Sequence, residues 1–349
     1  MGIDFRPPVA TRVPATVPPL RVAVVGAGGW GEQHARVFTD RTDTELVAVV
    51  GRDPGRTAAR AEAYGTTPYT DLDAMVATAR PDLVTVSLPN EAHFAPTLQL
   101  LRHGVPLLVE KPLVFDLDEA DTLLAEAERR GVFFAIDLNH RYAEPVLRAK
   151  QLLDAGELGD VVFVTWRFGG EPNFGTSPHA NLIETQVHGF DLLEHLCGPI
   201  VSVTAQAYDG ARPGVFTTVA VALELASGGV GTFLGTYDSS YAYPDSQRIE
   251  VNGTTGRLVV EDTVRRLVVS RPGEEVAQVW QAGYFDDEAR SFHTTFDRHV
   301  DAVLAALREG REPPVHARAG RRALELAHAV ARSGQEGVRV RTEPVSPPA

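Results

Sequence analysis

The stretch of sequence that decides the fold is Arg21-Val22-Ala23-Val24-Val25-Gly26-Ala27-Gly28-Gly29-Trp30-Gly31. Its first half is a short apolar run, which is typical of a buried β-strand. The second half matches G-x-G-x-x-G through Gly26, Gly28 and Gly31. Such glycines permit a tight turn, close approach of the backbone to a pyrophosphate, and close packing of a helix on a strand. Because the pattern follows a strand and precedes a helical segment, it predicts a dinucleotide-binding turn; a structural glycine turn is the alternative. Trp30 either covers the pyrophosphate or packs on the turn.

The end of the second predicted strand bears on the choice of cofactor. An Asp or Glu about 20 residues after the glycine turn binds the ribose 2′-hydroxyl of NAD in many dinucleotide-binding folds. Gly51 occupies the aligned position here, and Arg52 follows it. The absence of a carboxylate at the aligned position, with an arginine beside it, favours the 2′-phosphate of NADP. A shift of two residues would give Asp53 the ribose role and favour NAD instead.

Strands and helices alternate from the glycine turn to about residue 144. Asp116 is the expected N-cap of one of these helices, with Glu119 placed for a capping box and Gly131 for the C-terminal stop. Such alternation predicts a doubly wound parallel sheet, an α/β domain over residues 20–144. We expect strands at 21–25, 46–50, 83–88, 106–109 and 132–136, and helices at 57–64, 95–102 and 116–130.

Longer β-rich segments follow, and they predict an α+β domain over residues 145–340 with a large, mostly antiparallel open sheet. One face of that sheet could meet a subunit partner. A proline-rich arm is expected at 1–19 and a tail at 341–349. We expect strands at 161–168, 201–207, 217–225, 229–237, 248–251 and 257–260, and helices at 146–155, 292–308 and 317–332.

Composition narrows the classes of function. The chain has 349 residues and a net charge of −13, which argues against nucleic acid or an anionic membrane as a partner. Cys197 is the single cysteine, so no internal disulfide forms. The sequence contains neither an apolar stretch of about 20 residues nor a signal-peptide pattern at its start. A cytoplasmic location is therefore the expectation.

Lysine is rare in this chain. Of the 33 basic side chains, only Lys111 and Lys150 are lysines. Lys111 lies in Glu110-Lys111-Pro112 directly after the fourth predicted strand, and Leu88-Pro89-Asn90 follows the third. Because ligands bind at the carboxyl ends of parallel strands, we expect both segments near the ribose and nicotinamide. His93 either contacts the cofactor or caps the next helix.

The segment from Glu184 to Asp191 forms a second polar cluster. On a helix, Glu184, His188 and Asp191 would share one face, which would flank a titrating imidazole with carboxylates. Such a pattern suits general acid–base chemistry. A surface helix with an ordinary ion pair is the alternative. The other histidines show no ligand-like clustering, so no metal site is expected.

These motifs together resemble the glucose–fructose oxidoreductase / inositol dehydrogenase / MocA family. The resemblance rests on 22–31, 88–90, 110–112 and His188-x-x-Asp191, and extends to 139–142 and 156–159 in matching order. It implies a Rossmann domain, a substrate domain with an open sheet, a homodimer or homotetramer, and hydride transfer at a secondary alcohol of a sugar or cyclitol. The family's Glu-Lys-Pro lysine and Asp-x-x-x-His pair correspond to Lys111, Glu184 and His188. Two positions depart from the family pattern: Glu184 replaces aspartate, and Gln186 replaces a common glycine.

The resemblance also assigns roles to individual side chains. His188 would accept the hydroxyl proton, Lys111 would bind the carbinol oxygen, and Glu184 would orient His188. Arg141, Tyr142 and Asp191 would line the substrate side, although Arg141 and Tyr142 could instead anchor the domains together. The arginine bias is typical of a GC-rich, actinomycete-like genome, which suggests aminocyclitol or deoxysugar antibiotic biosynthesis of the streptomycin type. A non-catalytic dinucleotide sensor is the alternative function.

Overall fold

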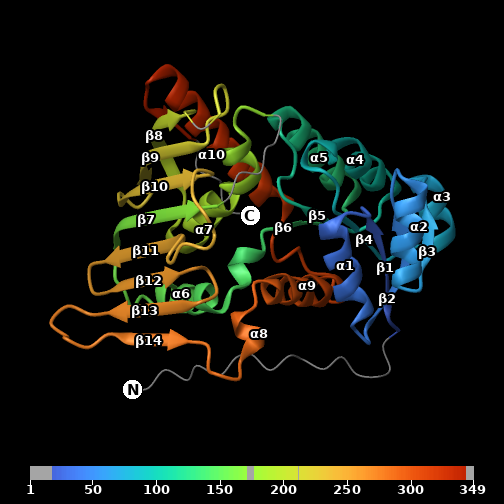
Figure 1. The fold of residues 1–349 in the computed structure, drawn as a ribbon, viewed down its shortest axis with the longest axis horizontal. Coiled ribbons are helices and arrows are strands. Elements are labelled where there is room, and N and C mark those ends of the chain that lie inside the picture. Colours follow the sequence, from blue (N-terminus) through green and yellow to red (C-terminus); the bar gives the residue numbers. More distant parts are fainter. Residues whose placement is uncertain (1–17, 171–176, 211, 343–349) are drawn as a thin grey trace. The chain divides into compact units, whose positions relative to one another are not determined.

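The computed structural model describes residues 18–170, 177–210 and 212–342 (Figure 1). Nearly all of the proline-rich arm predicted at 1–19, and residues 343–349 of the predicted tail, lie outside the described residues. Arg341, the first residue of that tail, belongs to strand β15 (Val340–Arg341) and pairs with Ser202. No helix within the described residues is long and apolar enough to cross a membrane.

The first six strands form one sheet in the order β3-β2-β1-β4-β5-β6. Strand β1 pairs with β2 and β4, β2 pairs with β3, and β5 pairs with β6, all in parallel, which confirms the predicted α/β class. Short apolar runs such as Val22–Val25 are almost fully buried because helices cover parallel sheets. The strands are β1 (Leu20–Val25), β2 (Thr44–Val50), β3 (Thr67–Tyr69), β4 (Leu83–Val86), β5 (Leu107–Glu110) and β6 (Phe134–Asp137).

The helices between these strands begin and end where their capping residues allow. Asp116 accepts hydrogen bonds from the backbone N–H groups of Asp118 and Glu119 at 2.9 and 3.1 Å, and Gly131 ends the helix with φ at 64°. The predicted cap and stop are thereby confirmed. The elements are α1 (Gly29–Thr39), α2 (Pro54–Ala63), α3 (Leu72–Ala79), the 3₁₀ turn η1 (Asn90–Ala92), α4 (Phe94–His103) and α5 (Leu117–Arg130).

The rest of the chain builds a nine-stranded sheet in the order β14-β13-β12-β11-β7-β10-β9-β8-β15. Within the described residues, neighbouring strands of this sheet pair antiparallel except β7 with β10, which confirms the predicted mostly antiparallel sheet. Its strands are β7 (Val161–Gly169), β8 (Ile200–Tyr208), β9 (Thr218–Leu225), β10 (Val230–Thr236), β11 (Gln247–Gly253), β12 (Arg257–Glu261), β13 (Arg266–Ser270), β14 (Gln278–Gln281) and β15.

Helices cover one face of this larger sheet, where α7 and α10 lie alongside it (Figure 1). Burial alternates along β9 and β10, so the other face carries the exposed side chains. The remaining elements are η2 (Asn139–Tyr142), α6 (Glu144–Asp154), the π-helical turn η3 (Asn181–Thr185), α7 (Val187–Cys197), α8 (Asp287–Arg290), α9 (His293–Arg308) and α10 (Ala317–Glu336).

By compactness the chain divides into two units, residues 1–88 and 89–349. The first unit holds the glycine turn with β1 to β4. The second holds β5, β6 and the nine-stranded sheet, together with Lys111 and His188. The functional boundary at residue 144 stays a prediction.

Candidate active site

The glycine turn of the first unit has the shape of a phosphate cradle. Gly26 has φ at 135°, and a Cβ there would lie 2.0 Å from the carbonyl oxygen of Ser87. A Cβ on Gly31 would lie 2.0 Å from the carbonyl oxygen of Gly26, so packing requires glycine at both positions. By contrast, a Cβ on Gly28 or Gly29 would meet no atom within 4 Å. The backbone is therefore open just before α1, and the site fits a pyrophosphate at a helix N-terminus.

The end of β2 in the first unit leaves little room for a side chain at Gly51. A Cβ on Gly51 would lie 2.4 Å from Oγ1 of Thr57. Asp53 caps α2 by accepting a hydrogen bond from the backbone N–H of Arg56 at 2.9 Å, while Arg52 is exposed. One carboxylate oxygen of Asp53 is thus engaged by its own helix. Trp30, in the first turn of α1, is 43% exposed.

Lys111 follows β5, as predicted, and its ammonium has a defined partner in the second unit. Its Nζ donates a hydrogen bond to the backbone carbonyl oxygen of Glu184 at 2.8 Å. Burial lowers the pKa of Lys111, and the nearby carboxylates of Glu110, Glu184 and Asp137 oppose that shift. The site therefore holds a cation whose proton is easier to remove than that of an exposed lysine. Glu110 itself is buried.

Glu184 lies in the π-helical turn η3, where Gln186 donates its backbone N–H to the carbonyl oxygen of Asn181 five residues earlier. Its side chain is 4% exposed and accepts a hydrogen bond from the side chain of Asn90. Burial raises the pKa of Glu184, while Lys111 and the Asn90 hydrogen bond oppose the rise. The structure thus brings Asn90, Lys111 and Glu184 together.

His188 sits in the first turn of α7 and stacks on His140. The two ring centroids are 3.9 Å apart and the ring planes differ by 12°. Burial lowers the pKa of His188 well below its ordinary value, and His140 and Lys111 lower it further. Burial and the charge of Lys111 lower the pKa of His140 to about 3. Both imidazoles are therefore neutral at physiological pH.

The predicted helical face joining Glu184 to His188 is wrong. The π-turn ends before α7 begins, so the regular i,i+4 spacing does not run through the segment. The ring beside His188 is that of His140, for which the sequence predicts no individual role. Its one signal was its place in 139–142, directly after β6. Within the described part of the chain, no group of three His, Cys, Asp or Glu could hold a metal ion.

Arg141 and Asp191, both predicted on the substrate side, bind each other. Arg141 donates from Nε and Nη2 to the two carboxylate oxygens of Asp191 at 2.8 and 2.5 Å. Tyr142 stacks on His299 with centroids 4.6 Å apart, and Nδ1 of His299 lies 2.6 Å from Oδ1 of Asp137. Burial raises the pKa of Tyr142. These side chains join η2 to α7 and α9 within the second unit.

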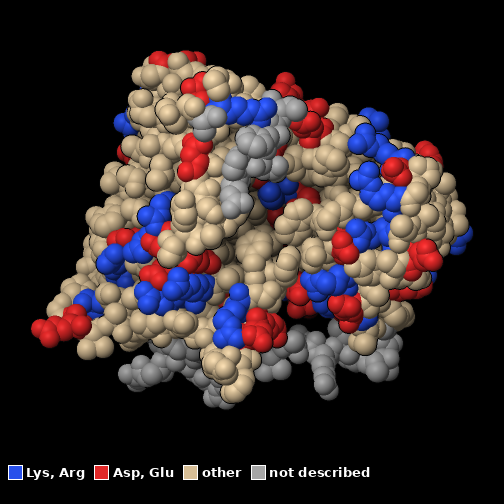
Figure 2. All heavy atoms as spheres, viewed as in Figure 1, with Lys and Arg blue, Asp and Glu red and all other residues tan. Residues whose placement is uncertain are grey.

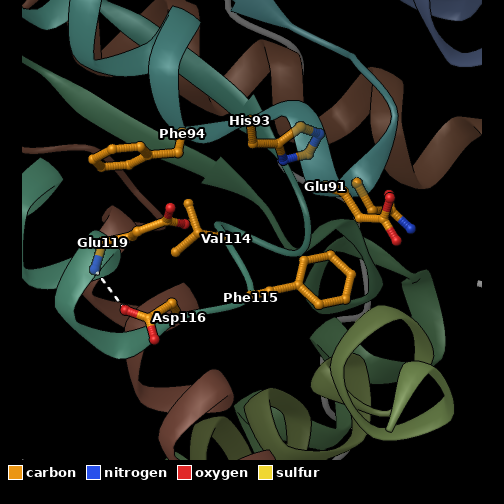
Figure 3. Close-up of a pocket in the computed structure, with 8 residues that line it drawn as sticks. Glu91, His93, Phe94, Val114, Phe115, Asp116 and Glu119 are labelled. Carbon is orange, nitrogen blue, oxygen red and sulfur yellow. Dashed lines mark hydrogen bonds between the residues drawn. The ribbon is translucent and has the colours of Figure 1, made fainter. Parts of the chain in front are cut away.

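His93 does not cap α4 through its side chain, and its contact with a cofactor stays a prediction. It stands at the N-cap of α4, but its side chain makes no capping bond. Its Nδ1 instead donates to the carbonyl oxygen of Pro112 at 2.7 Å, which ties α4 to the segment after Lys111. Figure 3 shows His93 and its neighbours around a pocket of about 340 Å³. The lining residues are Asn90, Glu91, His93, Phe94, Val114, Phe115, Asp116 and Glu119.

Two segments of this chain match models of a known protein family. Residues 20–138 match the family described as "Oxidoreductase family, NAD-binding Rossmann fold", and residues 150–342 match its C-terminal alpha/beta domain. The chain belongs to the Gfo/Idh/MocA oxidoreductase family. Membership confirms the predicted oxidoreductase class and the order of the two folds.

Two curated relatives match this chain, one over most of its length and one over about half. Inositol 2-dehydrogenase from Rhizobium meliloti (strain 1021) is 28% identical over 332 residues, covering 91% of this chain and 97% of the relative. D-glucoside 3-dehydrogenase from Escherichia coli (strain K12) is 31% identical over 206 residues, covering 55% of this chain and 59% of the relative. The solved structure of levoglucosan dehydrogenase with NADH has the same fold, with a TM-score of 0.85 at 17% identity, covering 94% of this chain and all of the other.

Proposed function

We propose that this chain transfers a hydride between a nicotinamide cofactor and a secondary alcohol or ketone of a cyclitol or sugar. One observation carries the proposal. Lys111 and Asn90 both donate hydrogen bonds to Glu184, and this cluster lies beside the neutral imidazole of His188. A buried ammonium and an unprotonated base are what removal of a hydroxyl proton requires. The names of relatives, inositol 2-dehydrogenase and D-glucoside 3-dehydrogenase, support a polyol substrate.

Each side chain then has a role in alcohol oxidation. His188 accepts the hydroxyl proton, and Lys111 donates a hydrogen bond to the oxygen as negative charge develops there. Glu184, which Asn90 holds by a hydrogen bond, accepts from a neighbouring hydroxyl of the ring. Bound nicotinamide supplies the redox chemistry, while the chain supplies geometry and proton handling. Gly26 to Gly31 would hold the pyrophosphate of the cofactor.

The cofactor that we propose is NADP. The closed space at Gly51 excludes a ribose-binding acid there, and the helix cap engages Asp53. Arg52 is exposed beside them and would pair with a 2′-phosphate. The ratio of KM values for NADP and NAD tests this, and Arg52→Ala should raise KM for NADP. Arg56→Ala, a neighbouring exposed arginine, is the matched control. A strong preference of the unmodified protein for NAD would contradict the assignment.

A substrate panel is the experiment that tests the proposed function. Inositols, aminocyclitols and nucleotide sugars are mixed with each cofactor, and the absorbance of reduced nicotinamide is followed. Turnover of an aminocyclitol or deoxysugar would support a role in antibiotic biosynthesis. Cofactor binding without turnover on any polyol or ketone would favour the dinucleotide sensor instead.

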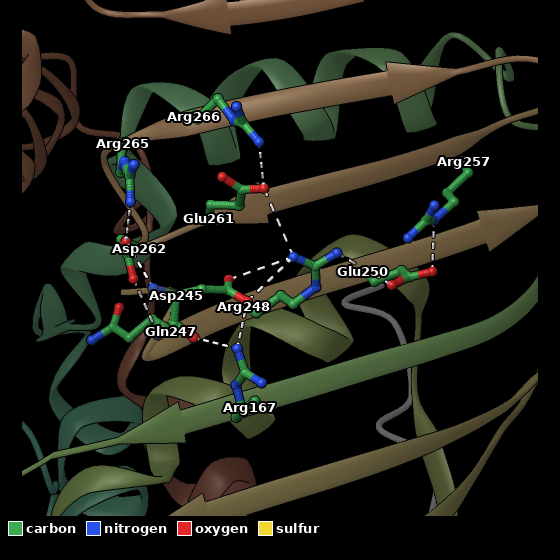
Figure 4. Close-up of polar contacts among 10 residues, drawn as sticks. All are labelled: Arg167, Asp245, Gln247, Arg248, Glu250, Arg257, Glu261, Asp262, Arg265 and Arg266. Atoms are coloured by element: carbon green, nitrogen blue, oxygen red, sulfur yellow. Dashed lines mark hydrogen bonds and ion pairs between the residues drawn. The ribbon is translucent and has the colours of Figure 1, made fainter. Parts of the chain in front are cut away.

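We also propose that the exposed face of the nine-stranded sheet joins subunits in a homodimer or homotetramer. Val230 and Leu234 are 57% and 38% exposed on β10, in the middle of that sheet. Figure 4 shows a network of ion pairs over β7 and β11 to β13, in which Arg257 pairs with Glu250 at 2.7 Å and Arg266 pairs with Glu261 at 2.8 Å. These charges are already paired within one chain, so covering them costs less than covering isolated charges.

On the face shown in Figure 2, acidic and basic side chains of the described residues alternate and form no broad area of one sign. Light scattering on Leu234→Glu should show a smaller particle than the unmodified protein. An unchanged mass would contradict this interface.

A further inference from the structure

Gln186 occupies a position where the sequence departs from the family pattern, and it lies at the end of the turn that carries Glu184. Its side chain is fully buried. Its Oε1 accepts a hydrogen bond from Nε1 of Trp166 at 3.0 Å, and its Nε2 donates to Oδ1 of Asn181 at 3.2 Å and to the carbonyl oxygen of Phe168 at 3.3 Å. The carboxamide therefore joins both ends of the π-turn η3 to strand β7.

Asn181 extends this network to two further positions around the nine-stranded sheet. Its Nδ2 donates to the carbonyl oxygens of Thr217 and Gly235 at 3.0 and 3.2 Å. Gln186 fits beside residue 235 only because that residue is glycine. A Cβ on Gly235 would lie 2.4 Å from the Gln186 side chain. Gly189 makes the same kind of space for Trp166, again at 2.4 Å. The turn is thus held in place by buried groups whose polar atoms are paired.

The π-turn matters because it decides where the carbonyl oxygen of Glu184 points. A π-turn is a rare register that has to be held by its surroundings. Reversion to an ordinary α-helical register would shift the segment by one residue. This shift would rotate the carbonyl group of Glu184 by about 100° around the helix axis. The Glu184 oxygen, which now accepts from Nζ of Lys111 at 2.8 Å, would then move away from the ammonium.

We propose that Gln186, with Trp166 and Asn181, is a positioning residue that holds the ammonium of Lys111 in place through the carbonyl group of Glu184. The hydrogen bonds of the Gln186 carboxamide go to Trp166, Asn181 and Phe168, so we assign it a role that acts through the turn. The catalytic consequence rests on the proposed function, but the effect on Lys111 does not, because it can be measured without a substrate.

The two lysines of the chain make a direct test possible. Protein labelled with ¹³C and ¹⁵N in lysine gives one Cε signal from Lys111 and one from Lys150, which lies on α6 paired with Asp154. Gln186→Leu removes all three hydrogen bonds of the carboxamide at similar volume, and Trp166→Phe removes the indole donor together with part of the ring volume. Thr44→Val is the matched control, since it removes one buried hydrogen bond, to the carbonyl oxygen of Phe38 at 2.7 Å, in the first unit.

The expected result is a shift of the Lys111 signal in Gln186→Leu and a smaller shift in Trp166→Phe, with the Lys150 signal unmoved in both. Thr44→Val should move neither signal. With a substrate in hand, kcat of Gln186→Leu should fall about 10-fold or more, as expected when a charge-assisted hydrogen bond is lost, while cofactor affinity stays unchanged.

The proposal would be overturned if the Lys111 signal had the same chemical shift in Gln186→Leu and Trp166→Phe as in the unmodified protein. If Gln186→Leu fails to fold, Trp166→Phe decides alone. Absence of turnover in the unmodified protein would count against the proposed function, whereas an unmoved Lys111 signal would count against the role of Gln186. The two failures are therefore distinguishable.

Discussion

Replacement of Lys111 by arginine tests whether a compact ammonium, rather than positive charge alone, is needed. Nζ of Lys111 donates to the Glu184 carbonyl oxygen at 2.8 Å in a buried setting beside Glu110 and Asp137. A planar guanidinium is larger and cannot take the same place. Loss of one preorganised donor to a developing oxyanion costs about 10²–10³ in kcat, or about 2.7–4 kcal/mol. Lys111→Arg should therefore lower kcat by about 10²–10³.

The assay is the initial rate of nicotinamide reduction on the polyol that the substrate panel identifies, with kcat and KM determined separately. Lys150→Arg is the matched control, because this lysine pairs with Asp154 on the surface of α6 and should give normal rates. Retention of more than half of kcat by Lys111→Arg would refute the reasoning, since charge alone would then suffice.

Three further predictions concern proton handling, stability and the glycine turn. Because burial, His140 and Lys111 hold the pKa of His188 below its ordinary 6.5, the acid limb of kcat for alcohol oxidation should lie below pH 6.5. A limb at or above that value, in rates measured between about pH 5 and 8, would contradict the assignment of the base. Arg322 on α10 pairs with Glu194 on α7 at 2.8 Å. Arg322→Ala leaves the Glu194 carboxylate without this buried partner and should lower the free energy of unfolding by about 3–5 kcal/mol. Arg321→Ala, next to it but 30% exposed, should cost about 0–1 kcal/mol in the same urea titration; equal losses would argue against burial as the cause. Gly31→Ala places a Cβ 2.0 Å from a backbone oxygen and should lower Tm, whereas Gly29→Ala, with nothing within 4 Å, should not. Calorimetry on both variants checks this, and a normal Tm for Gly31→Ala would be inconsistent with the tight turn.

Much of the fold could be predicted because local signals agree with it. Asp116 and Gly131 mark the ends of α5, and short apolar runs mark the buried strands of the parallel sheet. β3 and α3 were not predicted, since Thr67–Tyr69 spans only three residues and Leu72–Ala79 only eight. Such short elements form because neighbouring strands and helices supply their contacts, and these neighbours are not visible in a local pattern.

The candidate site was predicted in part, for the same reason. Lys111 and Asn90 follow strands whose carboxyl ends were recognisable, and His188 was recognised in its helix. The helical face joining Glu184 to His188 was wrong because periodicity assumes a regular helix, and the π-turn interrupts it. No property of the residues from 181 to 191 by themselves reveals that turn, which Trp166 and the sheet hold in place.

The sequence by itself determined the glycine turn, the alternation of strands and helices, the position of Lys111 directly after a strand, and that of His188 in a helix. These features depend on neighbours along the chain, so their patterns can be read locally. Only the tertiary structure decided that His140 stacks on His188, that Arg141 pairs with Asp191, and that a backbone carbonyl group holds the ammonium of Lys111. Each of those contacts joins segments far apart in the sequence, and packing rather than local propensity brings them together.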